Sequence, residues 1–265
     1  MRPVRGCAPF MDAILNVLQQ PGIGWFVLIG FVAQMFDGAI GMGFGVISST
    51  VLAAIGLPRE VASASVNGAK LLTGTASGTA HILLRNVDWR MLLVLGSAGA
   101  LGGVAGSVLL ARHAGPLLGI VVSVYLIGVG FVILRRAFHA TTPEVGRLRV
   151  GGVGLAGGFL EAVSGVWGPL VTSKLVAFGA LPRYAVGTGS IAETFVAGVV
   201  FSVLVSHLGF AQLSLTVLGL LGGAMLAAPL AALVARELPR RPLMIAVGVM
   251  VIILSAIRLA RDIGA

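Results

Sequence analysis

The chain has 265 residues, of which 57% are hydrophobic and only 10% are charged, and its mean hydropathy is +1.05. Soluble domains carry about 25% charged residues, so this composition excludes an ordinary soluble domain and indicates a polytopic helical membrane protein. The formal net charge of +9 comes from arginines scattered over short loops rather than gathered with aromatic residues, which argues against nucleic-acid binding and fits control of membrane topology.

Residues 1–21 form a tail in front of the first long apolar segment. The stretch 8–20 is too short and too interrupted for a secretory signal core, and it favours an interfacial helix before Pro21. Cys7, in this tail, is the single cysteine of the chain, which excludes an intramolecular disulfide and a cysteine-based metal cluster.

The rest of the chain repeats itself. Asp37 begins a pattern that Glu161 begins again 124 residues later: an acid, a glycine-rich break, and an apolar run closed by Leu-Pro-Arg. The chain therefore divides into repeat 1 (22–138), a linker (139–149) and repeat 2 (150–265), within one membrane domain. The predicted segments in chain order are 23–57, 60–84, 90–110 and 116–134 in repeat 1, and 150–181, 184–206, 212–235 and 242–258 in repeat 2.

The first segment of each repeat is too long for one crossing. A helix over 23–57 would extend about 50 Å, whereas the hydrocarbon core is about 30 Å thick. Each such segment therefore bends at its glycines and crosses the membrane an even number of times. With three further helices, each repeat then crosses the membrane an odd number of times. The sequence thus predicts an all-α polytopic fold of about 8–10 membrane segments, with repeat 2 inverted relative to repeat 1. The loop at 85–90 carries two arginines and its counterpart at 207–212 carries none, which agrees with opposite faces.

The glycine-rich breaks are the strongest candidates for a site. Irregular backbone at membrane depth is tolerated only inside protein or along a cavity, and a broken helix exposes an N-terminus that favours negative charge. The predicted substrate-binding residues are Gly41, Gly43, Gly45, Ser48, Ser49, Asn67, Lys70, Gly165, Trp167, Gly168, Pro169, Thr172, Ser173 and Lys174. The alternative is that the glycines serve close helix packing and that the hydroxyl groups bond their own helices.

Only two lysines occur, Lys70 and Lys174, and both lie inside apolar stretches, where a charge normally faces the protein interior or an aqueous path. Each could bind an anion directly or form a buried ion pair with an acid, and Glu193 lies within one residue of the repeat counterpart of Lys70. Buried acids can carry protons, so Glu161, Glu193 and Asp37 are the candidates for proton coupling. Capping of a helix end is the alternative role for Asp37.

His81 and His207 lie near predicted helix ends without a carboxylate at ligand spacing, so we interpret them as interfacial residues and predict no metal site. The sequence contains no nucleotide-binding loop, and we expect no cofactor. Trp167 falls within the second break, where we expect it to form part of the cavity wall.

Two halves that each open with an acid, a glycine-rich break, an apolar run and a Leu-Pro turn resemble the sulfite exporter TauE/SafE family, also called TSUP permeases, over roughly residues 22–260. The glycine-rich motif of the family corresponds here to 41–45 and 165–169, and Ser48-Ser49-Thr50 replaces the proline that often follows the first motif. The resemblance implies about eight spans in two repeats, and movement of sulfite, sulfoacetate, sulfonates or other small sulfur-containing anions.

We therefore expect a secondary transporter of a small sulfur-containing anion, multi-pass in the cytoplasmic (inner) membrane, with proton coupling left open. Its partners are then the anionic substrate and the lipid bilayer, with no nucleic acid, and the sequence leaves a monomer and a homodimer open. One alternative is a passive anion channel, which has the same site but no coupling carboxylate. The other is a membrane-embedded enzyme or assembly subunit, which would need a catalytic cluster.

Overall fold

The computed structural model describes residues 22–40, 43–112, 115–138, 148–178, 180–210, 213–237 and 240–264. The predicted N-terminal tail, most of the linker and Gly41 lie outside the described residues. Within these ranges the elements are α-helices: α2 (Ile23–Ile40), α3 (Phe44–Ala54), α4 (Arg59–Leu83), α5 (Trp89–Arg112), α6 (Pro116–Phe138), α7 (Leu148–Ser164), α8 (Gly168–Ala177), α9 (Pro182–Leu208), α10 (Ser214–Glu237) and α11 (Arg240–Gly264).

The chain is an all-α polytopic membrane protein. Large apolar side chains face outward along its helices, among them Leu101, Leu117 and Phe131, which are 68%, 74% and 59% exposed. Such exposure is expected where the surrounding solvent is lipid rather than water. Three of the described helical stretches are long and apolar enough to cross a membrane by length and composition: Trp89–Arg112, Leu117–Arg135 and Arg183–Leu208.

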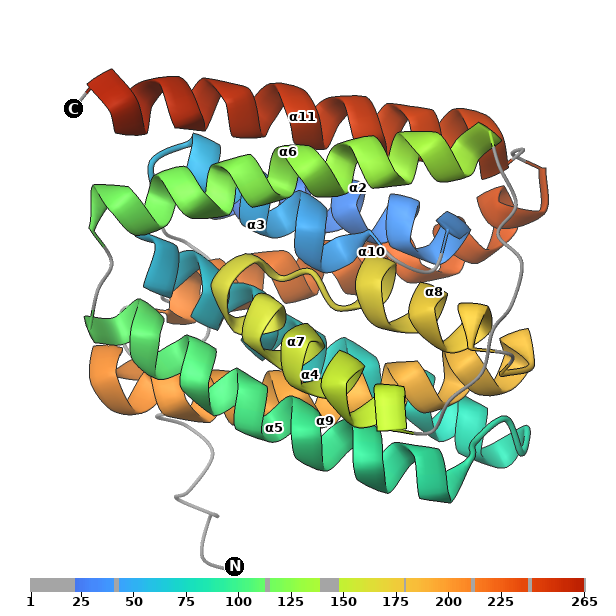
Figure 1. Cartoon of the computed structure of the whole chain (residues 1–265). Helices are drawn as coiled ribbons and strands as arrows, with labels where there is room; N and C mark the ends of the chain where they lie inside the picture. Colours follow the sequence, from blue (N-terminus) through green and yellow to red (C-terminus); the bar gives the residue numbers. More distant parts are fainter. Residues whose placement is uncertain are drawn as a thin grey trace, which may run out of the picture.

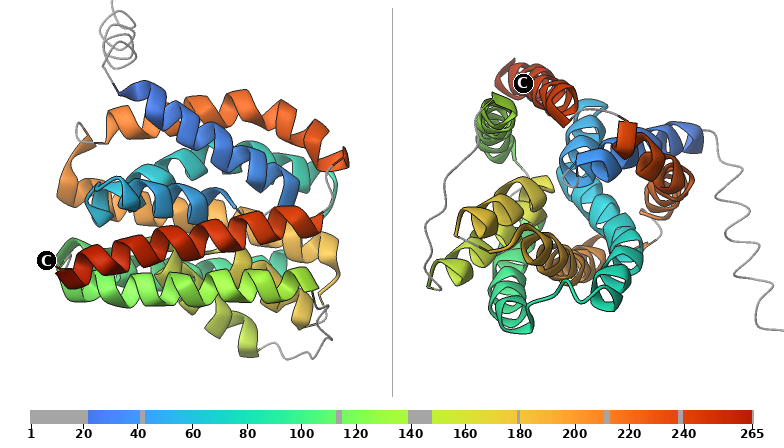
Figure 2. Two further views of the ribbon diagram at one scale, coloured as in Figure 1. Left: turned by 90° about the horizontal axis from the view of Figure 1, so that it is seen from above. Right: turned by 90° about the vertical axis from the view of Figure 1, so that its right-hand side faces the viewer.

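Helices far apart in the sequence lie side by side (Figures 1 and 2). α2 packs against α10, α5 against α7, α4 against α9, and α6 against α11. Each of these pairs joins a helix of the first half (22–138) to a helix of the second half (150–265). The two halves therefore interleave in one bundle instead of forming separate lobes.

Glycines allow two of these pairs to approach backbone to backbone. A side chain at Gly30 or Gly223 would collide with main-chain atoms across the contact of α2 with α10. A side chain at Gly102 or Gly158 would collide in the same way across the contact of α5 with α7. Close approach through small residues is a common means of helix association in lipid, where apolar side chains gain little by leaving the surrounding acyl chains.

Counterpart helices of the two halves run in opposite directions. In Figure 1, α6 begins at the left and ends at the right, whereas the neighbouring α11 begins at the right and ends at the left, where the C-terminus lies. α4 and α9 are antiparallel in the same way. α2, the first helix of its half, packs on the fourth helix of the other half (α10), and α7 packs on α5. The pattern of main neighbours is therefore the same when the halves are exchanged.

The breaks in the long segments fall at the predicted glycines. α2 is followed by the 11-residue α3, and α7 is followed by the 10-residue α8. At 1.5 Å per residue these short helices are about 15 Å long, roughly half the thickness of the hydrocarbon core. Each broken segment is thus a long helix followed by a half-length helix, and this places a helix N-terminus inside the bundle.

Candidate functional site

The first break places an acid on a helix N-terminus. Asp37, in the last turn of α2, accepts hydrogen bonds at Oδ1 from the backbone N–H groups of Gly43 (2.6 Å) and Phe44 (3.1 Å). The N–H groups that begin a helix have no acceptor within it, so the carboxylate satisfies them and complements the helix dipole. Asp37 therefore has the capping role that the sequence left open as an alternative.

The second break is held by a buried tryptophan. Gly165 has a φ of +70°, a conformation that favours glycine, and its N–H donates to the carbonyl of Glu161 (2.9 Å) where α7 ends. Trp167 is fully buried, and its indole N–H donates to the carbonyl of Gly189 in α9 (3.0 Å). The tryptophan thus ties the break to α9 from within the hydrophobic core, and it does not line the polar cavity described below.

The two breaks meet in the protein interior. Gly45, in the first turn of α3, lies so close to Gly165 that a Cβ atom on it would collide with the Gly165 carbonyl oxygen and with the ammonium group of Lys70. A Cβ atom on Gly165 would in turn meet the backbone of Gly45 and the hydroxyl of Ser49. Both glycines are buried. The broken helices of the two halves therefore form one contact, with Lys70 against it.

Lys70 bridges two acids of the second half. Its Nζ lies 2.7 Å from Oε1 of Glu161 and 2.6 Å from Oε1 of Glu193. Glu161 is fully buried, whereas the side chain of Glu193 is 26% exposed. Buried charges are tolerated when they are paired, and here one ammonium group is shared by two carboxylates. The structure thus contains the ion pair between Lys70 and Glu193 that the repeat offset suggested.

A polar cavity of about 270 Å³ lies beside Lys70. It is formed mainly by the C-terminal half of α4 and the N-terminal half of α9, with the broken helices at its inner end. It extends from the buried Lys70 to the exposed Ser77, and so reaches the surface on the side where α4 ends and α9 begins. Its polar lining residues are Gln34, Asp37, Lys70, Thr73, Ser77, His81, Thr172, Ser190, Glu193 and Thr194.

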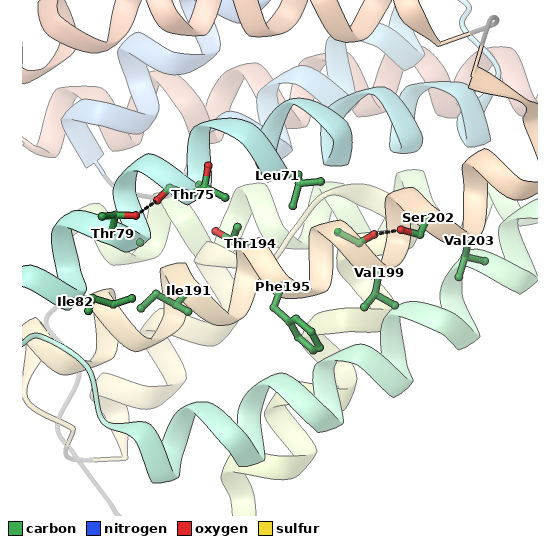
Figure 3. A pocket seen from close by; sticks show the side chains of 13 residues that line it. Leu71, Thr75, Thr79, Ile82, Ile191, Thr194, Phe195, Val199, Ser202 and Val203 are labelled. Atoms are coloured by element: carbon green, nitrogen blue, oxygen red, sulfur yellow. Dashed lines mark hydrogen bonds between the residues drawn. The ribbon is translucent and has the colours of Figure 1, made fainter.

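A larger cavity of about 670 Å³ adjoins the polar cavity and shares Gly74 and Thr194 with it (Figure 3). Its lining is mainly apolar, with Phe195 prominent, and none of the described residues that form it is charged. The hydroxyls of Thr79 and Ser202 donate to carbonyl oxygens one turn earlier in their own helices. The described residues of this larger cavity offer no charge to neutralise an ion, so the polar cavity is the candidate site.

The sequence matches the family model described as Sulfite exporter TauE/SafE over residues 26–259. The chain belongs to this family. It is also 32% identical over 241 residues to the "Probable membrane transporter protein YtnM" of Bacillus subtilis (strain 168), a match that covers 87% of this chain and 80% of that protein. No solved structure matches the chain significantly. The chain is therefore an integral multi-pass membrane protein of the TauE/SafE transporter type, as its resemblance indicated.

Several predicted site residues of this TauE/SafE protein lie next to the breaks without lining the polar cavity. Ser48, Ser49 and Asn67 are buried, and the hydroxyls of both serines and the amide oxygen of Asn67 have no hydrogen-bond partner among the described residues. Gly168 is the first residue of α8, and Thr172, one turn later, lines the cavity. The side chains of Pro169 and Ser173 lie outside the described residues.

Lys174 is the predicted residue that the structure places apart from the site. It lies in the last turn of α8 and is exposed, whereas Thr172 on the same helix faces the polar cavity. Two residues along a helix turn the side-chain direction by about 200°, so the lysine points away from the cavity. Of the two lysines in the TauE/SafE chain, the structure brings Lys70 to the site.

One face of α4 is polar along its whole length, and it includes site residues that were not predicted from the sequence. Arg59, Lys70 and His81 are 11 residues apart, which is about three helical turns, so they lie on one side of the helix. This spacing is the signal by which Ser77 and His81 could have been found from the sequence. The sequence predicts an interfacial position for His81, and the structure places it in the cavity wall. The whole face consists of Arg59, Ser63, Asn67, Lys70, Thr73, Ser77 and His81.

Proposed function

We propose that the protein is a secondary transporter that moves a small sulfur-containing anion, such as sulfite or an organosulfonate, across the cytoplasmic (inner) membrane. The observation that carries the proposal is the ammonium group of Lys70 at the inner end of a polar cavity, against the contact of two broken helices. The family description names sulfite export. A cavity of about 270 Å³ suits a compact ion better than a drug-sized molecule.

The charge balance of the cavity favours coupling to protons. Two carboxylates already share the ammonium group of Lys70, and Asp37 lies in the same cavity wall. With all three acids ionised, an arriving anion meets a net negative site and is repelled. When one carboxylate takes up a proton, the net negative charge is halved and one side of the ammonium group becomes available to the anion. The proton and the anion then bind together and cross in the same direction.

Glu193 is the better proton acceptor of the two acids that contact Lys70. It lines the polar cavity and is partly exposed, so water can deliver a proton to it. Glu161 is fully enclosed. Neutralising Glu193 leaves Lys70 held by Glu161 alone, with its other side facing the cavity. We therefore assign proton uptake to Glu193 and fixed positioning of the lysine to Glu161.

We further propose that the two halves form an inverted repeat whose relative movement exposes Lys70 to each side of the membrane in turn. The opposite directions of α4 and α9, and of α6 and α11, support this arrangement, and inverted repeats place the transport site near the membrane midplane. The arginines of loop 85–90 and Arg183 lie at the open end of the cavity, which favours a cytoplasmic position for that end.

The topology is tested by thiol labelling in a chain that carries Cys7→Ser. Val87→Cys and Ser206→Cys lie at the two ends of the bundle and should react with a membrane-impermeant reagent from opposite faces. Both variants should be reached after the membrane is permeabilised, which controls for buried positions. Reaction of both cysteines from one face would refute the inversion.

Transport by the purified full chain in liposomes tests the function. Methanesulfonate stays ionised across the accessible pH range, so its response to pH reports on the protein, and sulfite is the second probe. Uptake should rise when the side of entry is acidified, and Glu193→Gln should remove that response. Lys70→Met should lower uptake about thirtyfold or more, because truncating one partner of a buried charged site costs at least about 2 kcal/mol.

Lys174→Met is the matched control, because the same substitution is made at the lysine that points away from the cavity. It should leave uptake within about twofold, a difference of about 0.4 kcal/mol. If neither anion moves under any gradient, the proposed function is wrong. If the anions move but pH has no effect, and Glu161→Gln and Glu193→Gln are fully active, the protein is a passive anion channel.

A further inference from the structure

A second, much smaller cavity lies on the other side of the contact between the breaks. Its volume is about 20 Å³, which is room for one water molecule. Ser49, Ser63, Ser164 and Arg59 are among the residues that line it, and its other lining residues are apolar. The transport site described above does not use it.

The position of this cavity follows from α4. Arg59 and His81 are each 11 residues from Lys70, in opposite directions, so each is about 16 Å from the lysine along the helix axis. His81 lines the polar cavity and Arg59 lines the small one. The two cavities therefore lie on opposite sides of Lys70, towards opposite ends of the bundle. The contact of Gly45 with Gly165 lies between them.

The chemistry of the small cavity suits an oxyanion. Its polar lining residues are three serines and one arginine, and no carboxylate is among the described residues that line it. The hydroxyls of Ser63 and Ser164 donate to the carbonyls of Ala162 and Leu160, which leaves their oxygen lone pairs and the hydroxyl of Ser49 for a bound ligand. Ser49 lines this space, and its hydroxyl is buried next to Gly165 and has no hydrogen-bond partner in the described chain. A buried hydroxyl without a partner costs free energy, so a ligand or water that bonds it is favoured.

An ion pair closes the outer end of this cavity. The guanidinium of Arg59 donates to both carboxylate oxygens of Asp262 in α11, at 2.8 Å each, and to the carbonyl of Gly115 (2.8 Å). These bonds join the start of α4 to the end of α11 and to the residue before α6. The bonds of Arg59 therefore hold together three elements that must separate if this end is to open.

We propose that the small cavity is the closed second half of the transport path, and that Arg59 and Ser49 bind the anion after it has passed Lys70. The proposal rests on the function proposed above. When this end opens, Arg59 exchanges Asp262 for the anion, and the cavity widens from the volume of one water molecule to that of the ion. When the anion leaves, Arg59 returns to Asp262 and the path closes.

Transport of methanesulfonate by the full chain, measured separately from each face of oriented liposomes, tests the second site. Ser49→Ala and Arg59→Gln should raise the KM about tenfold for entry from the face at the start of α4, a loss of about 1.4 kcal/mol. The KM for entry from the face of the polar cavity should stay within about twofold. Arg112→Gln is the matched control, because it changes an exposed arginine at the same end of the bundle.

Thiol protection gives a readout that does not depend on transport rates. In a chain that carries Cys7→Ser and Ser63→Cys, the added Asp262→Asn should speed labelling from the face at the start of α4, and methanesulfonate should slow it. Suppose that the wild-type chain transports methanesulfonate. The proposal of a second site is then refuted if Ser49→Ala and Arg59→Gln change the KM equally at both faces, or if methanesulfonate never slows the labelling of Ser63→Cys. If the wild-type chain transports neither probe, the proposed function itself fails, and protection of Ser63→Cys by methanesulfonate would still show anion binding there. If Asp262→Asn exposes Ser63→Cys but no anion protects it, the cavity admits water only and the anion site is refuted.

Discussion

Removal of the shared ammonium group is the most direct perturbation of the site. The Nζ of Lys70 is 2.7 Å from one oxygen of Glu161 and 2.6 Å from one oxygen of Glu193. Those two oxygens are therefore at most about 5.3 Å apart, the sum of the distances. In Lys70→Met they face each other without a cation. At that separation, with an effective dielectric constant of 20, the repulsion of two ionised carboxylates is about 3 kcal/mol or more.

Lys70→Met should accordingly destabilise the protein by about 3–5 kcal/mol at pH 8, the range measured when one partner of a buried pair is removed. For a chain of this size that loss corresponds to a fall in Tm of roughly 6–20 °C. The sign of the pH dependence follows from the acids, since a carboxylate that gains a proton no longer repels its neighbour. The Tm difference from wild type should therefore be largest at pH 8 and shrink towards pH 5.

Thermal unfolding of the purified variants in detergent measures this difference. The double variant Lys70→Met/Glu161→Gln, which keeps one carboxylate and no lysine, should recover most of the lost Tm because the repulsion is gone. The single variant Glu161→Gln leaves Lys70 paired with Glu193 and should lose less than Lys70→Met. An equal Tm loss at pH 5 and pH 8, together with no recovery in the double variant, would refute the shared-ammonium reasoning.

Three further outcomes follow from the same geometry. Gly45→Ala should abolish transport and lower the stability of the fold by about 1–3 kcal/mol, because the added methyl group collides with the second break. In the control Gly128→Ala the added methyl group meets no atom within 4 Å, so the fold should be unchanged or stabilised by up to about 1 kcal/mol. Thermal unfolding and uptake measure both variants. Trp167→Phe removes the hydrogen bond from the second break to the Gly189 carbonyl and should cost about 1–3 kcal/mol in thermal unfolding; an unchanged Tm would contradict the anchoring role. His81→Gln keeps a polar group in the cavity wall and should change the KM for methanesulfonate uptake at pH 7 by less than about threefold. His81→Glu adds an acid there and should raise that KM about tenfold. Equal KM values for the two variants would mean that anions do not pass this wall.

The helices of this protein could be predicted well because their signals are local. The lengths of the apolar stretches predicted where the helices begin and end. The bounds of the predicted segments 60–84 and 90–110 therefore differ little from those of α4 and α5. Glycines placed both breaks, since few other residues permit a chain to turn within a buried segment. These features depend on neighbouring residues and need no knowledge of the tertiary fold.

The site could be predicted only in part, because it depends on which helix faces meet. The offset of 124 residues places Glu193 next to the sequence counterpart of Lys70, and the two side chains meet because α4 packs on the antiparallel α9. The same reasoning could not orient α8, where Thr172 faces the cavity and Lys174 faces away. A 10-residue helix with charge on one face and hydroxyls on another gives no sequence signal for its inner face.

The two acids that open the halves have different roles. Asp37 and Glu161 are counterparts, yet Asp37 caps the start of α3 while Glu161 holds Lys70. The lysine has no counterpart, because the corresponding residue of repeat 2 is Thr194. One half therefore supplies the cation and the other supplies both acids that bind it, so the charges of the site hold the two halves together.

In the proposed transport cycle, that asymmetry sets the order of events. If the halves move relative to each other, at least one of the two bonds of Lys70 must change, because both of them cross from one half to the other. Glu161 is fully buried, whereas Glu193 lines the polar cavity, which in the proposed cycle admits the anion and the proton. The anion should therefore displace Glu193 first, and movement of the empty carrier should be slow while both carboxylates hold the lysine. Exchange of labelled for unlabelled methanesulfonate across a liposome membrane should accordingly be faster than net efflux in wild type, and Glu193→Gln should reduce that difference; equal rates of exchange and net efflux in wild type would contradict this order.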